Sequence, residues 1–296
     1  MTHLPEVALA ELGSRAQALT RHLDAFLAGG GDAAVHDLRV AARRLRAALT
    51  VFAPLLLLPD TVRRRPLRRL ERRAGALRDL EVLGALLRRH GDAEADLAAT
   101  LDAELAAERE PAARRARGQA RKGRLRVLRQ DLDCWLEAPA FTPTAGLSAA
   151  AVCPDLLLPV LSEVLLEPAW AIARWPAAGA PEAAPLHRLR RRIKRLRYAV
   201  ECLHVVLEPA VAAWLEELHA IQDALGAWHD AGVLLARLER LAPPGPLHAA
   251  VSGEASAALA PWPAWRERYG GAEARTRLRA LLAVPPDEAG ARDGGG

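Results

Sequence analysis

Four cationic or protonatable side chains near the start of the chain recur at the spacing of a helical stripe. They are His36, Arg39, Arg43 and Arg46, at positions i, i+3, i+7 and i+10. Because an α-helix turns about 100° per residue, this spacing places all four side chains on one narrow face, and Leu38 and Leu45 fall on the opposite, apolar face. Guanidinium groups can each donate paired hydrogen bonds to a phosphate, and a histidine adds a charge that depends on pH near neutrality. The stripe therefore predicts a binding site for an extended anion.

A second stripe repeats this spacing in the other half of the chain. It consists of His187, Arg190, Lys194 and Arg197, and His187 stands 151 residues after His36. The same offset superimposes Gly75 and Asp79 on Gly226 and Asp230 without a gap. Two motifs that match at one register indicate an internal duplication. We therefore expect the two stripes to occupy equivalent places in two related halves.

The alternative interpretation of each stripe is a solvated, arginine-rich helix face without a ligand. Only Lys122 and Lys194 among the 41 basic residues are lysines, so the arginine content itself reflects a bias and carries little weight. A solubilising face normally mixes acids and bases at spacings of three and four. Acids are nearly absent from both stripes, with Glu201 at the end of the second as the exception. This absence favours an anionic ligand over a solvated face.

Other residues extend the candidate site with weaker support. A third run with the stripe spacing contains Arg117 and Arg121, which we include as candidate anion ligands. In each Gly-x-x-x-Asp element the glycine permits close helix packing, and we expect the aspartate to pair with an arginine of the stripe. Arg78 and His229 lie beside those aspartates and are further candidates. The remaining histidines, His219 among them, fit no ligand spacing and are interpreted as ordinary helix or surface residues.

Periodicity and helix breakers predict the elements that carry these residues. The aromatic content of 4% and the abundance of Leu and Ala favour helices over sheets. The expected fold class is all-α, with two tandem bundles of about four helices each related by pseudo-twofold symmetry. The expected domains are residues 1–145 and 146–285, followed by a disordered tail at 286–296. The expected helices span residues 5–28, 32–52, 63–89, 93–137 with a break near Pro111, Gly118 or Gly123, 156–175, 186–207, 211–241 and 247–283.

Net charge, cysteine content and hydropathy limit the classes of protein to which this chain can belong. The net charge of +5 makes an anionic partner plausible. The three scattered cysteines suggest no disulfide framework or zinc site, and they fit a reducing cytoplasm. The N-terminus has no signal-peptide pattern, and the apolar run at 54–59 is too short to span a bilayer. We expect a soluble, cytoplasmic protein without a membrane partner.

The two histidine helices together resemble the CHAD family, the conserved-histidine α-helical domain. The resemblance rests on His36-x-x-Arg39-x-x-x-Arg43-Arg44-x-Arg46, Leu186-His187-x-x-Arg190-x-x-x-Lys194-Arg195-Leu196-Arg197-Tyr198-x-x-Glu201, Gly75-x-x-Arg78-Asp79 and Leu225-Gly226-x-x-x-Asp230. It implies two helical bundles around a basic groove that binds inorganic polyphosphate. By this resemblance, the side chains of both stripes line the groove in this chain. Tyr198 is a further hydrogen-bond donor to the anion. The first half has no such donor, because Ala47 occupies the equivalent position. The implied partners are a triphosphate tunnel enzyme and polyphosphate or storage granules.

No catalytic signature accompanies the stripes. The chain lacks the Glu-x-Glu-x-Lys signature of tunnel phosphatases, a Gly-x-x-x-x-Gly-Lys loop and stripe acids that could hold Mg²⁺. We therefore expect a binding module without catalytic residues, metal or cofactor. The alternatives are a nucleic-acid-binding protein and a granule-associated scaffold. Nucleic acid is the less favoured ligand, because the stripes contain no Asn or Gln and Tyr198 is their only aromatic residue.

Overall fold

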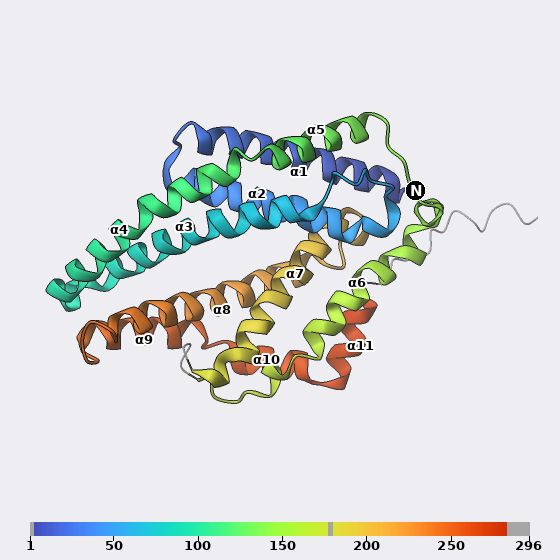
Figure 1. Ribbon diagram of the computed structural model, residues 1–296. Coiled ribbons are helices and arrows are strands. Elements are labelled where there is room, and N and C mark those ends of the chain that lie inside the picture. Colours follow the sequence, from blue (N-terminus) through green and yellow to red (C-terminus); the bar gives the residue numbers. More distant parts are fainter. Residues whose placement is uncertain (1–2, 177–179, 283–296) are drawn as a thin grey trace, which may run out of the picture.

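Long amphipathic helices build both halves of the chain (Figure 1). The computed structural model describes residues 3–176 and 180–282, and within these ranges the only β-type pairing is an isolated bridge between Leu56 and Phe141. The all-α prediction is confirmed. The first half contains α1 (Leu4–Leu27), α2 (Gly31–Val51), α3 (Arg64–His90), α4 (Ala95–Ala120) and α5 (Gly123–Glu137). The second contains α6 (Ala149–Leu165), α7 (Ala184–Leu207), α8 (Ala212–Leu238), α9 (Pro246–Ala258), α10 (Trp262–Gly270) and α11 (Ala272–Ala280).

The same order of packed helices occurs in each half. In the first, α1 packs on α2, α2 on α3 and α3 on α4, and α6 to α9 follow the same order in the second. Across the halves, α2 packs against α7 and α3 against α8. In Figure 1, α1 to α5 form the upper part and α6 to α11 the lower part. The domain boundaries and the twofold relation of the halves stay predictions, and residues 286–296 lie outside the described ranges.

Buried leucines fix the rotation of the two stripe helices. In α2, Leu38 and Leu45 are fully buried, and in α7 Leu189 and Leu196 are fully buried at the equivalent positions. Each such side chain contributes about 1.5 to 3 kcal/mol by leaving water. A rotation that moved either stripe away from its neighbours would expose these leucines. The core faces therefore determine where the cationic faces point.

Several predicted helix boundaries are wrong. The N-cap of α2 is Gly30, not Asp32, and the chain enters this helix through Gly29 and Gly31, which both have positive φ. The break predicted near Pro111, Gly118 or Gly123 is confirmed at the last of these places, because α4 continues through Pro111 to Ala120 and α5 begins at Gly123. The predicted helix at 156–175 begins earlier, at Ala149, and ends at Leu165, and a 3-10 turn at Pro168–Ala171 follows.

One stretch is longer and more apolar than expected from the sequence. Ala149–Ala171 has a mean hydropathy of 1.8 and is long and apolar enough to cross a membrane. The run at 54–59 is therefore not the longest apolar stretch of the chain. A single stretch of this kind is weak evidence for a membrane span, because core helices of soluble proteins can be equally long and apolar. The regular helix within it is α6, which packs against α7.

Candidate anion-binding site

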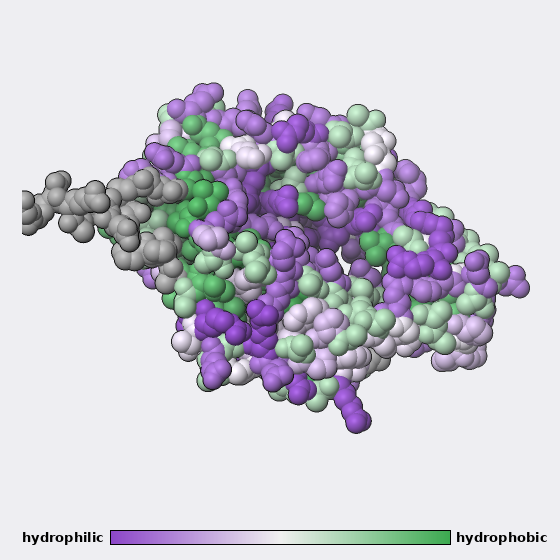
Figure 2. All heavy atoms as spheres, turned by 180° about the vertical axis from the view of Figure 1, so that it is seen from behind, coloured by the Kyte–Doolittle hydropathy of each residue, from purple (hydrophilic) through white to green (hydrophobic). Residues whose placement is uncertain are grey.

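The central helices α2, α3, α7 and α8 enclose a polar cleft of about 650 Å³. Seen from behind, hydrophilic side chains gather around a hollow between the two halves (Figure 2). Eight Arg and Lys side chains line the cleft, against four Asp and Glu side chains. The basic lining is Arg39, Arg43, Arg44, Arg78, Arg89, Arg190, Lys194 and Arg197, and the acidic lining is Glu81, Asp223, Asp230 and Glu254. The cleft is therefore suited to an anion.

Equivalent residues of the two stripes converge at the middle of this cleft. Arg39 and Arg190 occupy the same place in the duplication, and so do Arg43 and Lys194. Burial, and then the charge of Arg43, lower the pKa of Arg39. Burial also lowers the pKa of Arg190, whose Nε has no hydrogen-bond partner among the described residues. Four basic side chains from two halves thus crowd one place.

The Gly-x-x-x-Asp elements position two of these arginines. A Cβ atom at Gly75 would lie 3.7 Å from Arg39 Nε, and one at Gly226 would lie 3.9 Å from Arg190 Nε. Each glycine therefore leaves room for an arginine side chain, whereas the sequence had suggested close approach of two helices. Asp79 Oδ1 lies 3.6 Å from Arg39 Nη1, which confirms the predicted pairing in the first half. Burial raises the pKa of Asp230, and the nearby Arg190 opposes that rise.

Lys194 has the most perturbed environment in the cleft. Burial, together with the charges of Arg43, Arg190, Arg39 and Arg197, lowers its pKa to about 6. A bound anion would favour the charged ammonium form and reverse this shift. At neutral pH, Lys194 is thus a side chain whose ammonium form is favoured when negative charge enters the cleft.

His36 and Arg78 line the cleft beside these central cations. Burial, followed by the charge of Arg78, lowers the pKa of His36. Arg78 Nη1 lies 3.2 Å from Glu81 Oε2, and burial raises the pKa of Glu81. Arg89 also lines the cleft and pairs with Glu254 of α9. The part of the lining that comes from α3 therefore mixes cations with carboxylates.

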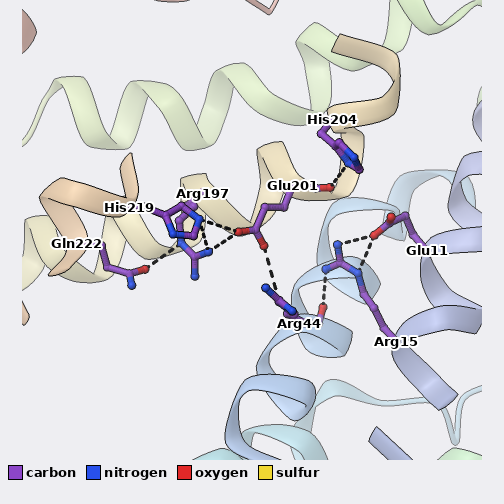
Figure 3. Close-up of polar contacts among 8 residues, drawn as sticks. All are labelled: Glu11, Arg15, Arg44, Arg197, Glu201, His204, His219 and Gln222. Carbon is purple, nitrogen blue, oxygen red and sulfur yellow. Dashed lines mark hydrogen bonds and ion pairs between the residues drawn. The ribbon is translucent and has the colours of Figure 1, made fainter. Parts of the chain in front are cut away.

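A carboxylate network holds Arg197 in the cleft wall (Figure 3). Arg197 is 4% exposed, donates from Nε to Gln222 Oε1 at 3.0 Å, and pairs with Glu201. Glu201 also lies 3.3 Å from His219 Nε2 and 3.9 Å from Arg44 Nε, so it joins α7 to α8 and to α2. The Arg197 guanidinium lies 4.1 Å from the centre of the Tyr198 ring, a cation–π contact.

Four predicted site residues do not line this cleft. Arg46 pairs with Glu71, with its Nε 3.0 Å from Glu71 Oε2. His187 packs against Trp228 and His229, and these two histidines line a separate hollow beside Arg237. Arg117 lies near the end of α4 and Arg121 is exposed just after it; neither is brought together with the two stripes. The cleft does contain the other seven: His36, Arg39, Arg43, Arg190, Lys194, Arg197 and Tyr198.

Sequence reasoning missed several residues that contact the stripes or line the cleft. Glu71 and Gln222 stand one helical turn before Gly75 and Gly226, so a search of that helix face could have found them. His219 was interpreted as an ordinary histidine but lines the cleft and contacts Glu201. Arg89 had no signal in the sequence, because its place depends on the packing of α9 against α3.

Comparison with known proteins places the chain in a family. The CHAD domain family matches residues 10–239. The chain belongs to the CHAD family. No curated protein matches the sequence. The CHAD domain from the plant Ricinus communis is 28% identical, with a TM-score of 0.64, and the alignment covers 95% of this chain and 93% of that one.

A second solved structure shares the fold. The protein PptA from Streptomyces chartreusis is 22% identical, with a TM-score of 0.57, and the alignment covers 95% of this chain and 99% of that one. This CHAD domain therefore has solved relatives over nearly its whole length. Among the described residues, no group of three or more His, Cys, Asp and Glu side chains could hold a metal ion.

Proposed function

We propose that this CHAD domain binds inorganic polyphosphate in the cleft between its halves, without catalysing a reaction. The observation that carries the proposal is the meeting of Arg39, Arg43, Arg190 and Lys194 from two separate helices in one cleft. Polyphosphate binding is the known property of CHAD domains. A chain of phosphates offers repeated negative charges at short spacing, which suits a cluster of guanidinium groups.

The binding step is electrostatic and needs no covalent chemistry. Arginines donate paired hydrogen bonds to phosphate oxygens, and Lys194 takes up a proton as negative charge arrives. Two carboxylates of the lining, Glu81 and Glu254, already pair with the peripheral cations Arg78 and Arg89. The central cations are therefore the ones with most capacity left for a ligand.

A competition titration tests this function. The full chain is titrated with long-chain polyphosphate, single-stranded DNA and duplex DNA at about 0.15 M salt, where screening is physiological. We expect polyphosphate to bind most tightly and to displace both nucleic acids. Preference for either nucleic acid would reject polyphosphate as the ligand and favour the nucleic-acid alternative. Phosphate released from polyphosphate by the chain alone would contradict the non-catalytic proposal.

The same proposal extends to partners and location. We propose that the domain works in the cytoplasm, alongside a triphosphate tunnel enzyme or on polyphosphate granules, because its ligand would be concentrated there. Co-sedimentation with isolated granules is the direct test. Retention that persists after the polyphosphate is digested would point to a protein scaffold instead of polyphosphate binding.

A further inference from the structure

Equivalent residues of the duplication contribute unequally to the cleft. Both members of the central pairs line it, but each outer pair supplies one member only. His36 lines the cleft and His187 does not; Arg78 does and His229 does not; Arg197 does and Arg46 does not. The cleft therefore contains one of the two ends that a symmetric duplication would create. The counterparts that do not line it have other partners: His187 packs on Trp228, and Arg46 pairs with Glu71.

A carboxylate takes the place of a ligand at that second end. Glu71 is 9% exposed and lies between two stripe arginines. Its Oε1 is 3.4 Å from Arg43 Nε, and its Oε2 is 3.0 Å from Arg46 Nε. A carboxylate so placed uses the same charge-assisted contacts that a phosphate would use. Glu71 thus neutralises the first-half cations from within the protein.

The equivalent residue of the second half carries no charge. Gln222 stands 151 residues after Glu71, and its Oε1 accepts from Arg197 Nε at 3.0 Å, just as Glu71 accepts from Arg46 Nε. The carboxylate nearest to Arg197 is instead Glu201 of α7. Lys194, the counterpart of Arg43, has no carboxylate within 4.0 Å in the part of the chain that the structure describes. One charge difference at equivalent positions therefore leaves Lys194 available and Arg43 partly occupied.

We propose that Glu71 and Gln222 determine where a phosphate chain lies and how many of its phosphates the protein covers. This inference rests on the proposed function and deepens it. Glu71 acts as an internal anion that excludes phosphates from the Arg46 end. Gln222 adds no carboxylate beside Arg197 and Lys194, so that the chain runs from the central cations past His36 and Arg78. The two residues are specificity-determining positions for polyanion length.

Exchange of the two residues tests this proposal. The variants are Glu71→Gln, Gln222→Glu and the combined exchange, and Gln222 in the native protein shows that an amide fits such a site. The control is Glu163→Gln, which changes net charge equally but breaks an ion pair with Arg195 outside the cleft. The probes are tripolyphosphate and linear polyphosphate of about 50 phosphates, titrated at several salt concentrations. The Tm of each variant is measured to confirm folding.

Glu71→Gln is expected to tighten binding of the long chain about tenfold and to steepen its salt dependence, because one more cation contacts phosphate. Tripolyphosphate should change little, since it needs only the end away from Glu71. Gln222→Glu is expected to weaken both probes at least tenfold. Unchanged or weaker long-chain binding by Glu71→Gln, or a gain as large in Glu163→Gln, would overturn this proposal alone. Absence of any polyphosphate binding by the native chain would overturn the proposed function as well.

Discussion

The Arg39 side chain lies against Gly75, with its Nε 3.7 Å from the position that a Cβ atom would take. Arg190 lies against Gly226 in the same way, at 3.9 Å. These contacts explain why glycine recurs at one turn from an aspartate in both halves. Its absent side chain makes room for a cation that must reach the cleft.

The effect of substituting Gly75 should depend on the size of the new side chain. Gly75→Ala places a Cβ at ordinary contact distance, so binding should persist, and helix propensity should add up to about 1 kcal/mol of stability. Gly75→Leu should displace Arg39 and weaken polyphosphate binding about tenfold or more, the effect of losing one charge-assisted contact. Titration calorimetry and thermal melts measure both effects. Native affinity in the leucine variant would show that Arg39 does not need this space.

Loss of two central cations should nearly abolish binding. Arg43→Gln combined with Lys194→Gln removes two charge-assisted contacts of about 1.5 to 3 kcal/mol each, which is roughly a 100- to 10,000-fold loss. Glutamine is preferred to glutamate at position 43, because a carboxylate there would face Glu71. The helical circular-dichroism signal should not change. A dissociation constant within about threefold of the native value would place the ligand elsewhere.

Polyphosphate binding should take up a proton near neutral pH. Lys194, whose pKa is about 6, faces Arg39 and Arg43 from α2, Arg190 and Arg197 from its own helix, and Asp230 from α8. A bound anion favours the ammonium form, so affinity should fall as pH rises above about 6. Calorimetry at pH 7.5 in buffers of different ionisation enthalpy should give an uptake approaching about one proton. The Lys194→Met variant should lose most of this proton uptake. Proton uptake that persists in the variant would show that another group takes up the proton.

The unliganded protein should be stabilised by removal of the Lys194 charge. Because the folded pKa of about 6 lies below the ordinary value of 10.5, folding opposes protonation. The resulting cost is complete below pH 6, fades as pH rises towards 10.5 and is absent above it. Lys194→Met should therefore raise Tm at pH 5 by at least about 2 °C, and by less at pH 9. An equal gain at both pH values would indicate better packing instead of a relieved charge.

Much of the fold was predictable because its periodicity is strong. The stripe helices, the duplication at an offset of 151 and the pairing of Asp79 with a stripe arginine followed from residue spacing, and the structure identifies that arginine as Arg39. Boundaries were less predictable, because packing on α3 carries α4 through Pro111. Spacing was misleading for the region of α6, which begins at Ala149 and belongs to a stretch, Ala149–Ala171, that is long and apolar enough to cross a membrane.

The candidate site was predictable only as far as the two halves are equivalent. Spacing treats His36 and His187 alike, and likewise Arg46 and Arg197. Only one member of each pair lines the cleft, because Glu71 pairs with Arg46 and because His187 packs on Trp228. These differences depend on contacts between helices far apart in the sequence. A one-dimensional pattern does not contain them.

The crowding of Arg39, Arg43, Arg190 and Lys194 has a consequence for the lifetime of the molecule. An empty cleft holds these four basic side chains together without a ligand, at a cost in free energy, so the ligand-free chain is the less stable form. A ligand at 100 times its dissociation constant adds about 2.7 kcal/mol to folding stability, a roughly hundredfold decrease in the unfolded fraction that proteases attack. If the ligand is polyphosphate, as proposed above, cells that exhaust it would degrade this protein faster, and its abundance would then depend on the size of the reserve.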